Sequence, residues 1–156
     1  MKVFRSELNA EFKDKLFDIT VGDLPNHGSR FKKDTIQCIL SSTKVRFGFH
    51  LAGSLSATRS YECDRCLKSF SLEEQIHVNM WLASNRGITA KDEPEVIFFP
   101  DSMDMIELAG IFAELLFISE PMKKLCNDQC KGFCPQCGIN LNHGNCICES
   151  SDSNNP

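Results

Sequence analysis

Residues 125–148 read Leu-Cys-Asn-Asp-Gln-Cys-Lys-Gly-Phe-Cys-Pro-Gln-Cys-Gly-Ile-Asn-Leu-Asn-His-Gly-Asn-Cys-Ile-Cys. Six cysteines fall here at short spacings: Cys126, Cys130, Cys134, Cys137, Cys146 and Cys148. The Cys134-Pro-Gln-Cys137-Gly138 run has the pattern of a zinc knuckle. Two thiolates hold one ion in such a knuckle, and the glycine permits a tight turn that carries N–H groups toward sulfur. This stretch therefore predicts a small metal-braced module at the C-terminal end of the fold.

A further pair, Cys63 and Cys66, lies upstream in Cys-Asp-Arg-Cys. Structural zinc takes four thiolates, so the eight paired cysteines match two ions, with one ion as the main rival. The favoured sets are Cys63, Cys66, Cys126 and Cys130 for one site, and Cys134, Cys137, Cys146 and Cys148 for the other. The open alternatives are a pairing of Cys126 and Cys130 with Cys134 and Cys137, a single ion with spare thiols, and an iron–sulfur cluster. His143 is another possible ligand, but its Asn-His-Gly-Asn setting is typical of a turn.

The redox compartment supports metal rather than disulfides. The chain of 156 residues has no run near the roughly 18 apolar residues of a spanning helix, and its start lacks the apolar run of a secretory signal. We therefore expect a cytoplasmic protein without a membrane partner, in a compartment that disfavours structural disulfides. The ninth cysteine, Cys38, stands in an apolar segment and is expected to be a small buried hydrophobe.

The rest of the chain predicts an α+β fold. Alternating apolar residues predict a half-buried strand at 44–51, and Gly53 predicts a turn or bulge before a second strand that ends at Cys63. A third strand at 75–82 has Trp81 on its polar face, and a short strand follows at 96–99. Three sequential strands are most simply an antiparallel meander.

One amphipathic helix is expected to pack on this sheet. It should open with Asp101 or Ser102 as N-cap and stop by Pro121, which cannot continue a helix. Its apolar stripe comprises Met105, Leu108, Phe112, Leu115 and Leu116. The polar stretch 84–95 reads as a loop, and 23–28 as a turn. The expected domains are an α+β core over 1–125, a zinc-binding module over 126–148 packed on the core, and a disordered tail over 149–156.

Charge and motifs exclude several functions. The net charge of −4 divides into +4 for residues 1–60, −8 for 61–120 and 0 for 121–156, which argues against a bulk nucleic-acid coat. A local basic face is still open. Its candidates early in the chain are Arg30, Lys32, Lys33, Lys44, Arg46 and Arg59, and those near the cysteines are Arg65, Lys123, Lys124 and Lys131. Catalytic zinc keeps an open ligand position, which an all-cysteine set does not provide, and phosphate-loop and hydrolase motifs are missing. We expect no enzyme, with a redox dithiol at Cys63 and Cys66 as a minor alternative.

The ordered string of motifs resembles the bacterial YceD family, the large ribosomal RNA subunit accumulation proteins, which have relatives in plastids. The resemblance runs over about residues 36–148 and is carried by Cys63-Asp-Arg-Cys66-Leu67, by Glu120-Pro121, and by the string from Cys126 to Cys148. Phe133 stands where the family pattern favours leucine, which keeps the apolar character. The first 35 residues lie outside the resemblance. Membership implies a role in making or stabilising the RNA of the large ribosomal subunit.

The resemblance, with the absence of catalytic motifs, implies a non-enzymatic ribosome-biogenesis factor. Its expected partners are large-subunit ribosomal RNA, a large-subunit ribosomal protein, or both. If RNA is contacted directly, Arg65, Lys123, Lys124 and Lys131 are expected to bind phosphate rather than read bases. The alternative is a zinc-dependent protein-binding module whose effect on ribosomal RNA is indirect.

Overall fold

The computed structural model describes residues 1–85 and 96–148, and these divide into two compact units. Unit 1 comprises residues 1–59 and 71–120, and unit 2 comprises residues 60–70 and everything from 121 onward. Most of the loop expected at 84–95 and all of the tail expected at 149–156 lie outside the described residues. The boundary expected at residue 125 stays a prediction. No helix in the described ranges is long and apolar enough to cross a membrane.

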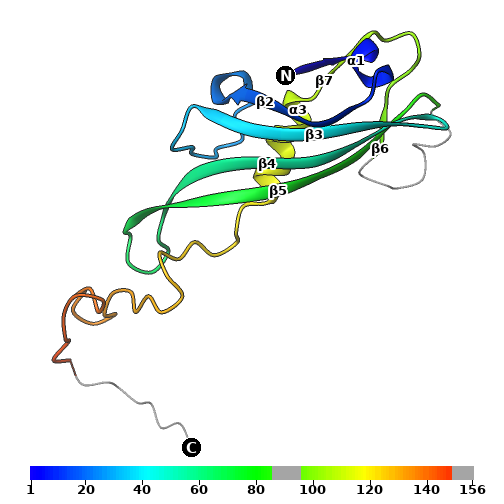
Figure 1. Cartoon of the computed structure of the whole chain (residues 1–156). Helices are drawn as coiled ribbons and strands as arrows, with labels where there is room; N and C mark the ends of the chain where they lie inside the picture. The colour runs from blue at the N-terminus through cyan, green and yellow to red at the C-terminus, as the bar shows by residue number, and fades with distance from the viewer. Residues whose placement is uncertain (86–95, 149–156) are drawn as a thin grey trace, which may run out of the picture. The chain divides into compact units, whose positions relative to one another are not determined.

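Unit 1 is built on one five-stranded sheet (Figure 1). Its strand order is β2-β3-β4-β5-β6, with β2 and β3 antiparallel, β3 and β4 antiparallel, and β6 parallel to β5. The strands are β2 (Phe12–Thr20), β3 (Thr35–Val45), β4 (Gly48–Glu62), β5 (Ser69–Ala83) and β6 (Val96–Phe98). The α+β class with a mostly antiparallel sheet is therefore confirmed.

Two strand boundaries differ from the prediction. The turn between β3 and β4 lies at Arg46 and Phe47, inside the strand expected at 44–51. A turn of two residues does not change which of the odd and even positions carry apolar side chains. The apolar–polar alternation of the sequence therefore continues across the turn without a break. Gly53 is not a turn but lies within β4 opposite Leu40, and a Cβ there would sit 1.9 Å from the carbonyl oxygen of Ile39. Glycine is needed at this position because the two backbones approach so closely.

The helix begins later than expected. Residues Met105–Glu107 form strand β7, which pairs antiparallel with β1 (Lys2–Phe4), and α1 (Arg5–Asn9) follows β1 directly. Helix α3 covers Ala109–Ile118, so neither Asp101 nor Ser102 is its N-cap. Pairing with β1 explains this difference. The partner of β7 lies about a hundred residues away in the sequence, so the local pattern of residues does not indicate the strand. A short 3-10 helix, η1 (Val21–Asp23), completes unit 1.

The core of unit 1 lies between the sheet and α3, which Figure 1 shows crossing behind β3, β4 and β5. Phe112 and Leu116 of α3 are fully buried in one cluster with Leu40 and Leu55 of the sheet. Burial of each such side chain stabilises the fold by about 1.5–3 kcal/mol. Cys38 belongs to the same cluster, and burial raises the pKa of its thiol to about 12. It is a core residue, as expected.

Candidate metal centre

Unit 2 gathers the eight paired cysteines into two groups. The first thiol cluster consists of Cys63, Cys66, Cys126 and Cys130, and the second thiol cluster of Cys134, Cys137, Cys146 and Cys148. The four sulfurs of each cluster lie within 4.8 Å of one another. The grouping is the favoured pairing of the sequence analysis, and the described residues give no support to a mixed pairing. His143 lies outside both clusters in a turn, where its N–H donates to the carbonyl of Asn140.

Local hydrogen bonds bring the two halves of the first cluster together. After β4 the chain turns at Cys63–Cys66, and the N–H of Leu67 donates to the carbonyl of Cys63. Asp64 then bridges to the second segment: its N–H donates to the carbonyl of Lys124, and its carboxylate accepts from the N–H of Lys124 at 2.6 Å. The Arg65 guanidinium donates to the carbonyl of Cys130 at 2.7 Å. The donors of these bonds are residues that are not cysteines, and the bonds fix the backbone of the two cysteine segments.

The sulfur spacing fits a single ion. Four sulfurs placed tetrahedrally at about 2.3 Å from one zinc lie about 3.8 Å from one another. In the first cluster, Cys63 and Cys130 are 3.8 Å apart and Cys66 and Cys126 are 3.7 Å apart, between sulfurs. All four are free thiols, since a disulfide bond is only about 2.05 Å long. Because all four sulfurs lie within 4.8 Å of one another, they are too close together to surround the irons and sulfides of an iron–sulfur cluster.

Backbone N–H groups favour a thiolate at the first cluster. Burial opposes ionisation of Cys63, but the N–H groups of Cys126, Arg65 and Cys66 outweigh it and lower the pKa of that thiol to about 6. Burial and the neighbouring sulfurs instead raise the pKa of Cys126 to about 12. Four thiolates therefore cannot share this space without a cation among them, because like charges repel. A divalent ion satisfies that requirement.

The second cluster has the geometry of the expected knuckle. Gly138 adopts a positive φ of 71°, its N–H donates to the carbonyl of Cys134, and the N–H of Cys134 donates to the carbonyl of Ile139. The turn directs the N–H groups of Cys137 and Gln136 at the Cys134 sulfur, which lowers the pKa of that thiol to about 6. The sulfur of Cys146 lies 3.3 Å from that of Cys134 and 3.4 Å from that of Cys137. These sulfurs need to separate by about 0.4–0.5 Å to reach tetrahedral zinc spacing.

The two clusters differ in burial. Cys63, Cys66 and Cys130 are buried and pack with the partly buried Phe70 and Leu125, whereas Cys137 of the second cluster is exposed. The first cluster is thus the centre of a small core in unit 2. The second is a surface site with local support.

All four cations expected to contact RNA lie in unit 2. Arg65 and Lys131 are exposed, and they flank the first cluster in the chain. The Nζ of Lys124 lies 5.3 Å from the ring centroid of Tyr61, and Lys123 beside it is exposed. The backbone N–H of Lys131 donates to Asn142 at 2.8 Å. Each cation is therefore on a segment whose backbone is fixed by hydrogen bonds.

Arg59 is excluded from any basic surface. Its side chain is fully buried in unit 1, where it forms ion pairs with Glu74 and Glu120. It also donates to the carbonyl of Leu116 near the end of α3. The sequence predicts a basic-face candidate here, because it does not indicate the two acidic partners, which lie 15 and 61 residues further along the chain. Arg59 is a structural residue.

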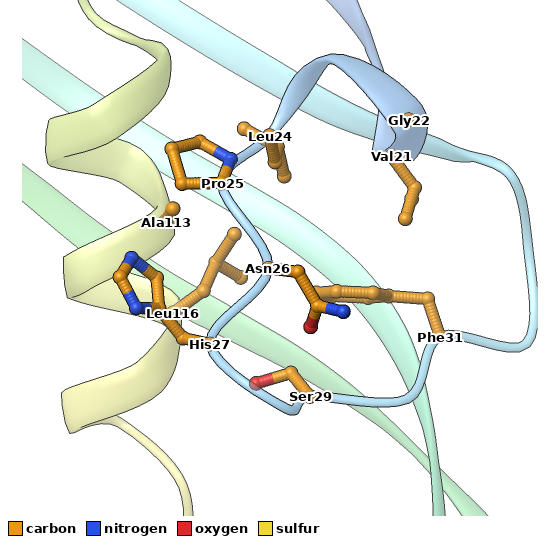
Figure 2. Close-up of a pocket in the computed structure, with 10 residues that line it drawn as sticks. All are labelled: Val21, Gly22, Leu24, Pro25, Asn26, His27, Ser29, Phe31, Ala113 and Leu116. Atoms are coloured by element: carbon orange, nitrogen blue, oxygen red, sulfur yellow. The ribbon is translucent and has the colours of Figure 1, made fainter.

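A hollow of about 280 Å³ in unit 1 was not foreseen. Figure 2 shows that it lies between the segment 21–31 and helix α3, with Ala113 and Leu116 on the helix side. Most of its lining is apolar, and His27 at its edge packs against Phe117, with ring centroids 5.9 Å apart. The hydroxyl of Ser29 donates to the carboxylate of Glu120 at 2.5 Å. The sequence signalled only the turn at 23–28, and nothing local indicated that it faces a helix.

The comparison with protein families matches the part of the chain that contains both clusters. The model described as "Large ribosomal RNA subunit accumulation protein YceD" matches residues 51–156, well over half of the chain. The matched span begins inside β4, contains all eight clustered cysteines and leaves out β1, β2 and β3. No curated protein and no solved structure matches this chain.

Proposed function

Because this chain belongs to the YceD family, we propose that it is a non-enzymatic ribosome-biogenesis factor that supports the accumulation of large-subunit ribosomal RNA. It acts in the cytoplasm, where a reducing environment keeps the cysteines available as metal ligands. Its partner is the RNA itself, bound through unit 2.

The two thiol clusters hold one zinc ion each. Four thiolates at tetrahedral spacing are the ligand set of structural zinc, and sulfur distances of 3.7 and 3.8 Å in the first cluster support this. An all-thiolate site leaves no position open for a substrate, so the role of the metal is structural. It fixes the turn after β4 to the segment that follows α3.

The observation that carries the RNA proposal is the position of the four cations. Arg65 is between two ligands of the first cluster, Lys131 directly follows a third, and Lys124 is bonded through its backbone to Asp64. Cations carried on a fixed backbone lose no further backbone freedom when they bind, which favours phosphate contacts that set register rather than read sequence. Metal loading and RNA binding are therefore coupled.

The alternative role for these cations is to balance the metal sites. The described part of unit 2 has five Lys and Arg against three Asp and Glu, a net charge of +2. Two tetrathiolate zinc sites would add −4 and bring it to −2. A cation that only neutralises thiolate has no effect on RNA affinity, whereas one that contacts phosphate adds to the salt dependence of binding.

Salt titration separates these roles. A chain that carries Lys123→Ala, Lys124→Ala and Lys131→Ala should bind large-subunit ribosomal RNA more weakly, with a log–log salt slope lower by about 2–3. The matched control changes three exposed lysines of unit 1, Lys13→Ala, Lys32→Ala and Lys33→Ala. The proposal fails if affinity is independent of salt, or if the control triple variant loses as much binding as the unit 2 variant.

A protein partner is the second candidate, supported by the hollow beside α3 (Figure 2). An apolar hollow of about 280 Å³ is small for a drug-sized ligand but suits one large apolar side chain. The −8 charge of residues 61–120 suits a basic ribosomal protein. Pull-down of a ribosomal protein that survives ribonuclease would favour this candidate, and complete loss after ribonuclease would favour RNA.

A further inference from the structure

An aromatic platform lies at one end of the sheet in unit 1. Its residues are separate in the sequence from the clustered cysteines. It consists of Arg46 and Phe47 in the turn between β3 and β4, His50 on β4, and Trp81 on β5. Phe47 is 49% exposed and Trp81 is 38% exposed. The guanidinium of Arg46 lies 5.1 Å from the centroid of the Phe47 ring. The platform thus presents two accessible rings and one cation.

Neighbouring groups hold the Trp81 ring and the backbone of the turn that carries Phe47. The imidazole of His50 stacks on Trp81 with centroids 4.2 Å apart and planes at 26°, and its Nε2 is 2.7 Å from the amide oxygen of Asn79. The carbonyl of Phe47 accepts from the N–H of Ser84 at 2.9 Å, which ties the turn to the end of β5. An exposed ring fixed in this way loses little conformational entropy when a ligand stacks on it.

A hollow of about 350 Å³ opens at the platform. Arg46, Phe47 and Trp81 line it together with apolar residues, and no described residue in its lining carries a carboxylate. Flat aromatic walls beside a guanidinium suit a ligand that has a planar ring and an anionic group. Unpaired nucleotides have both, and proteins bind them by stacking bases on aromatic side chains.

From this geometry we propose that the platform binds an unpaired nucleotide of single-stranded RNA. The base stacks on Trp81 and Phe47, and Arg46 contacts a phosphate. Stacking accepts any base, since every base has a π-face, so the site selects single strands rather than a sequence. This inference rests on the proposed function, since it takes RNA as the partner, but it assigns a separate contact on unit 1.

The platform contains its own reporter. Trp81 is the single tryptophan of the chain, so its fluorescence reports on this site alone. Titration of the zinc-loaded full chain with a ten-nucleotide oligouridylate should quench that fluorescence to saturation. A blunt RNA duplex of ten base pairs should quench it much less.

Variants then test the individual contacts, with affinity measured by the anisotropy of a labelled oligouridylate. Trp81→Leu removes one base stack and should lower the affinity by about 5- to 150-fold. Phe47→Leu should also lower the affinity. Arg46→Gln should reduce the salt slope by about 0.7. The control is Leu16→Ala, another exposed apolar residue of the same sheet, at which affinity should not change. Circular dichroism establishes that each variant is folded.

The outcomes separate this inference from the proposed function. If oligouridylate and ribosomal RNA bind, and the unit 2 lysine variant weakens that binding but Trp81 does not respond, the platform proposal is wrong and the proposed function stands. If no RNA binds the full chain, both fail. Quenching by an apolar peptide but not by oligouridylate would also overturn the platform proposal, in favour of a protein partner.

Discussion

Replacement of Arg59 by methionine is the substitution whose cost the structure defines best. The side chain of Arg59 is fully buried, and its guanidinium pairs with Glu74 of β5 and, at 3.6 Å, with Glu120 beyond α3. It donates to the hydroxyl of Ser119 at 2.8 Å and to the carbonyl of Leu116. The residue thus joins β4, β5 and the C-terminal end of the helix. Methionine keeps most of the volume and removes every one of these polar contacts.

The expected loss of stability follows from the two carboxylates that lose their cation. Removal of one partner from a buried ion pair costs about 3–5 kcal/mol, because the other charge stays uncompensated. The side chains of Glu74 and Glu120 are each 18% exposed, so water can reach them in part, and the lower end of this range applies. We expect Arg59→Met to reduce the free energy of unfolding by about 3 kcal/mol. With an m-value of about 1–3 kcal/mol/M, the urea midpoint should fall by about 1–3 M.

Urea unfolding of the zinc-loaded chain, followed by Trp81 fluorescence, measures this cost because that tryptophan belongs to unit 1. The control is Arg30→Met, at an exposed position, where a change within about 0.5 kcal/mol is expected. Glu74→Gln combined with Arg59→Met should cost less than the two single changes together, since each removes the same pair. A loss below about 1 kcal/mol for Arg59→Met would refute the reasoning.

Two further changes test the sheet and the metal sites. Gly53→Ala places a Cβ 1.9 Å from the carbonyl oxygen of Ile39 and should destabilise the chain by about 1–3 kcal/mol in the same urea assay. The control is Gly22→Ala, whose Cβ would meet nothing within 4 Å and which should be neutral. Cys63→Ser and Cys148→Ser should each lower the zinc content from two ions to one. The first should cost about 1.4 kcal/mol more in stability, because Cys63 and Cys130 are 67 residues apart whereas Cys134 and Cys148 are 14 residues apart. Equal losses for the two serine variants would contradict this difference.

The sequence was most informative where chemistry is local. The spacing of Cys134 and Cys137 with Gly138 indicates a knuckle, and the turn geometry agrees because it depends on five neighbouring residues. Alternation placed Trp81 on the polar face of its strand, where the structure also has it. Spacing grouped the cysteines into close pairs but left the combination of pairs open, and the structure brings together the favoured sets.

Features that depend on distant partners were missed or misplaced. The sequence predicts too early a start for the helix. Met105–Glu107 instead forms a strand with β1, which lies close in the fold but far away in the sequence. Arg59 looked like a surface charge because Glu74 and Glu120 reach it only through the fold. The stack of His50 on Trp81 has the same origin, since it joins adjacent strands from positions 31 residues apart in the sequence. Pairing of this kind leaves no local pattern to read.

The central claim is that the zinc-braced unit 2 contacts large-subunit ribosomal RNA, and crosslinking in living cells tests it most directly. The bound RNA is sequenced and the crosslinked peptides are identified. We predict crosslinks to large-subunit ribosomal RNA at peptides from residues 60–70 and 121–148, lost when Cys63→Ser removes the first metal site. Crosslinks that are absent from ribosomal RNA, or that persist unchanged in the Cys63→Ser chain, would contradict the account.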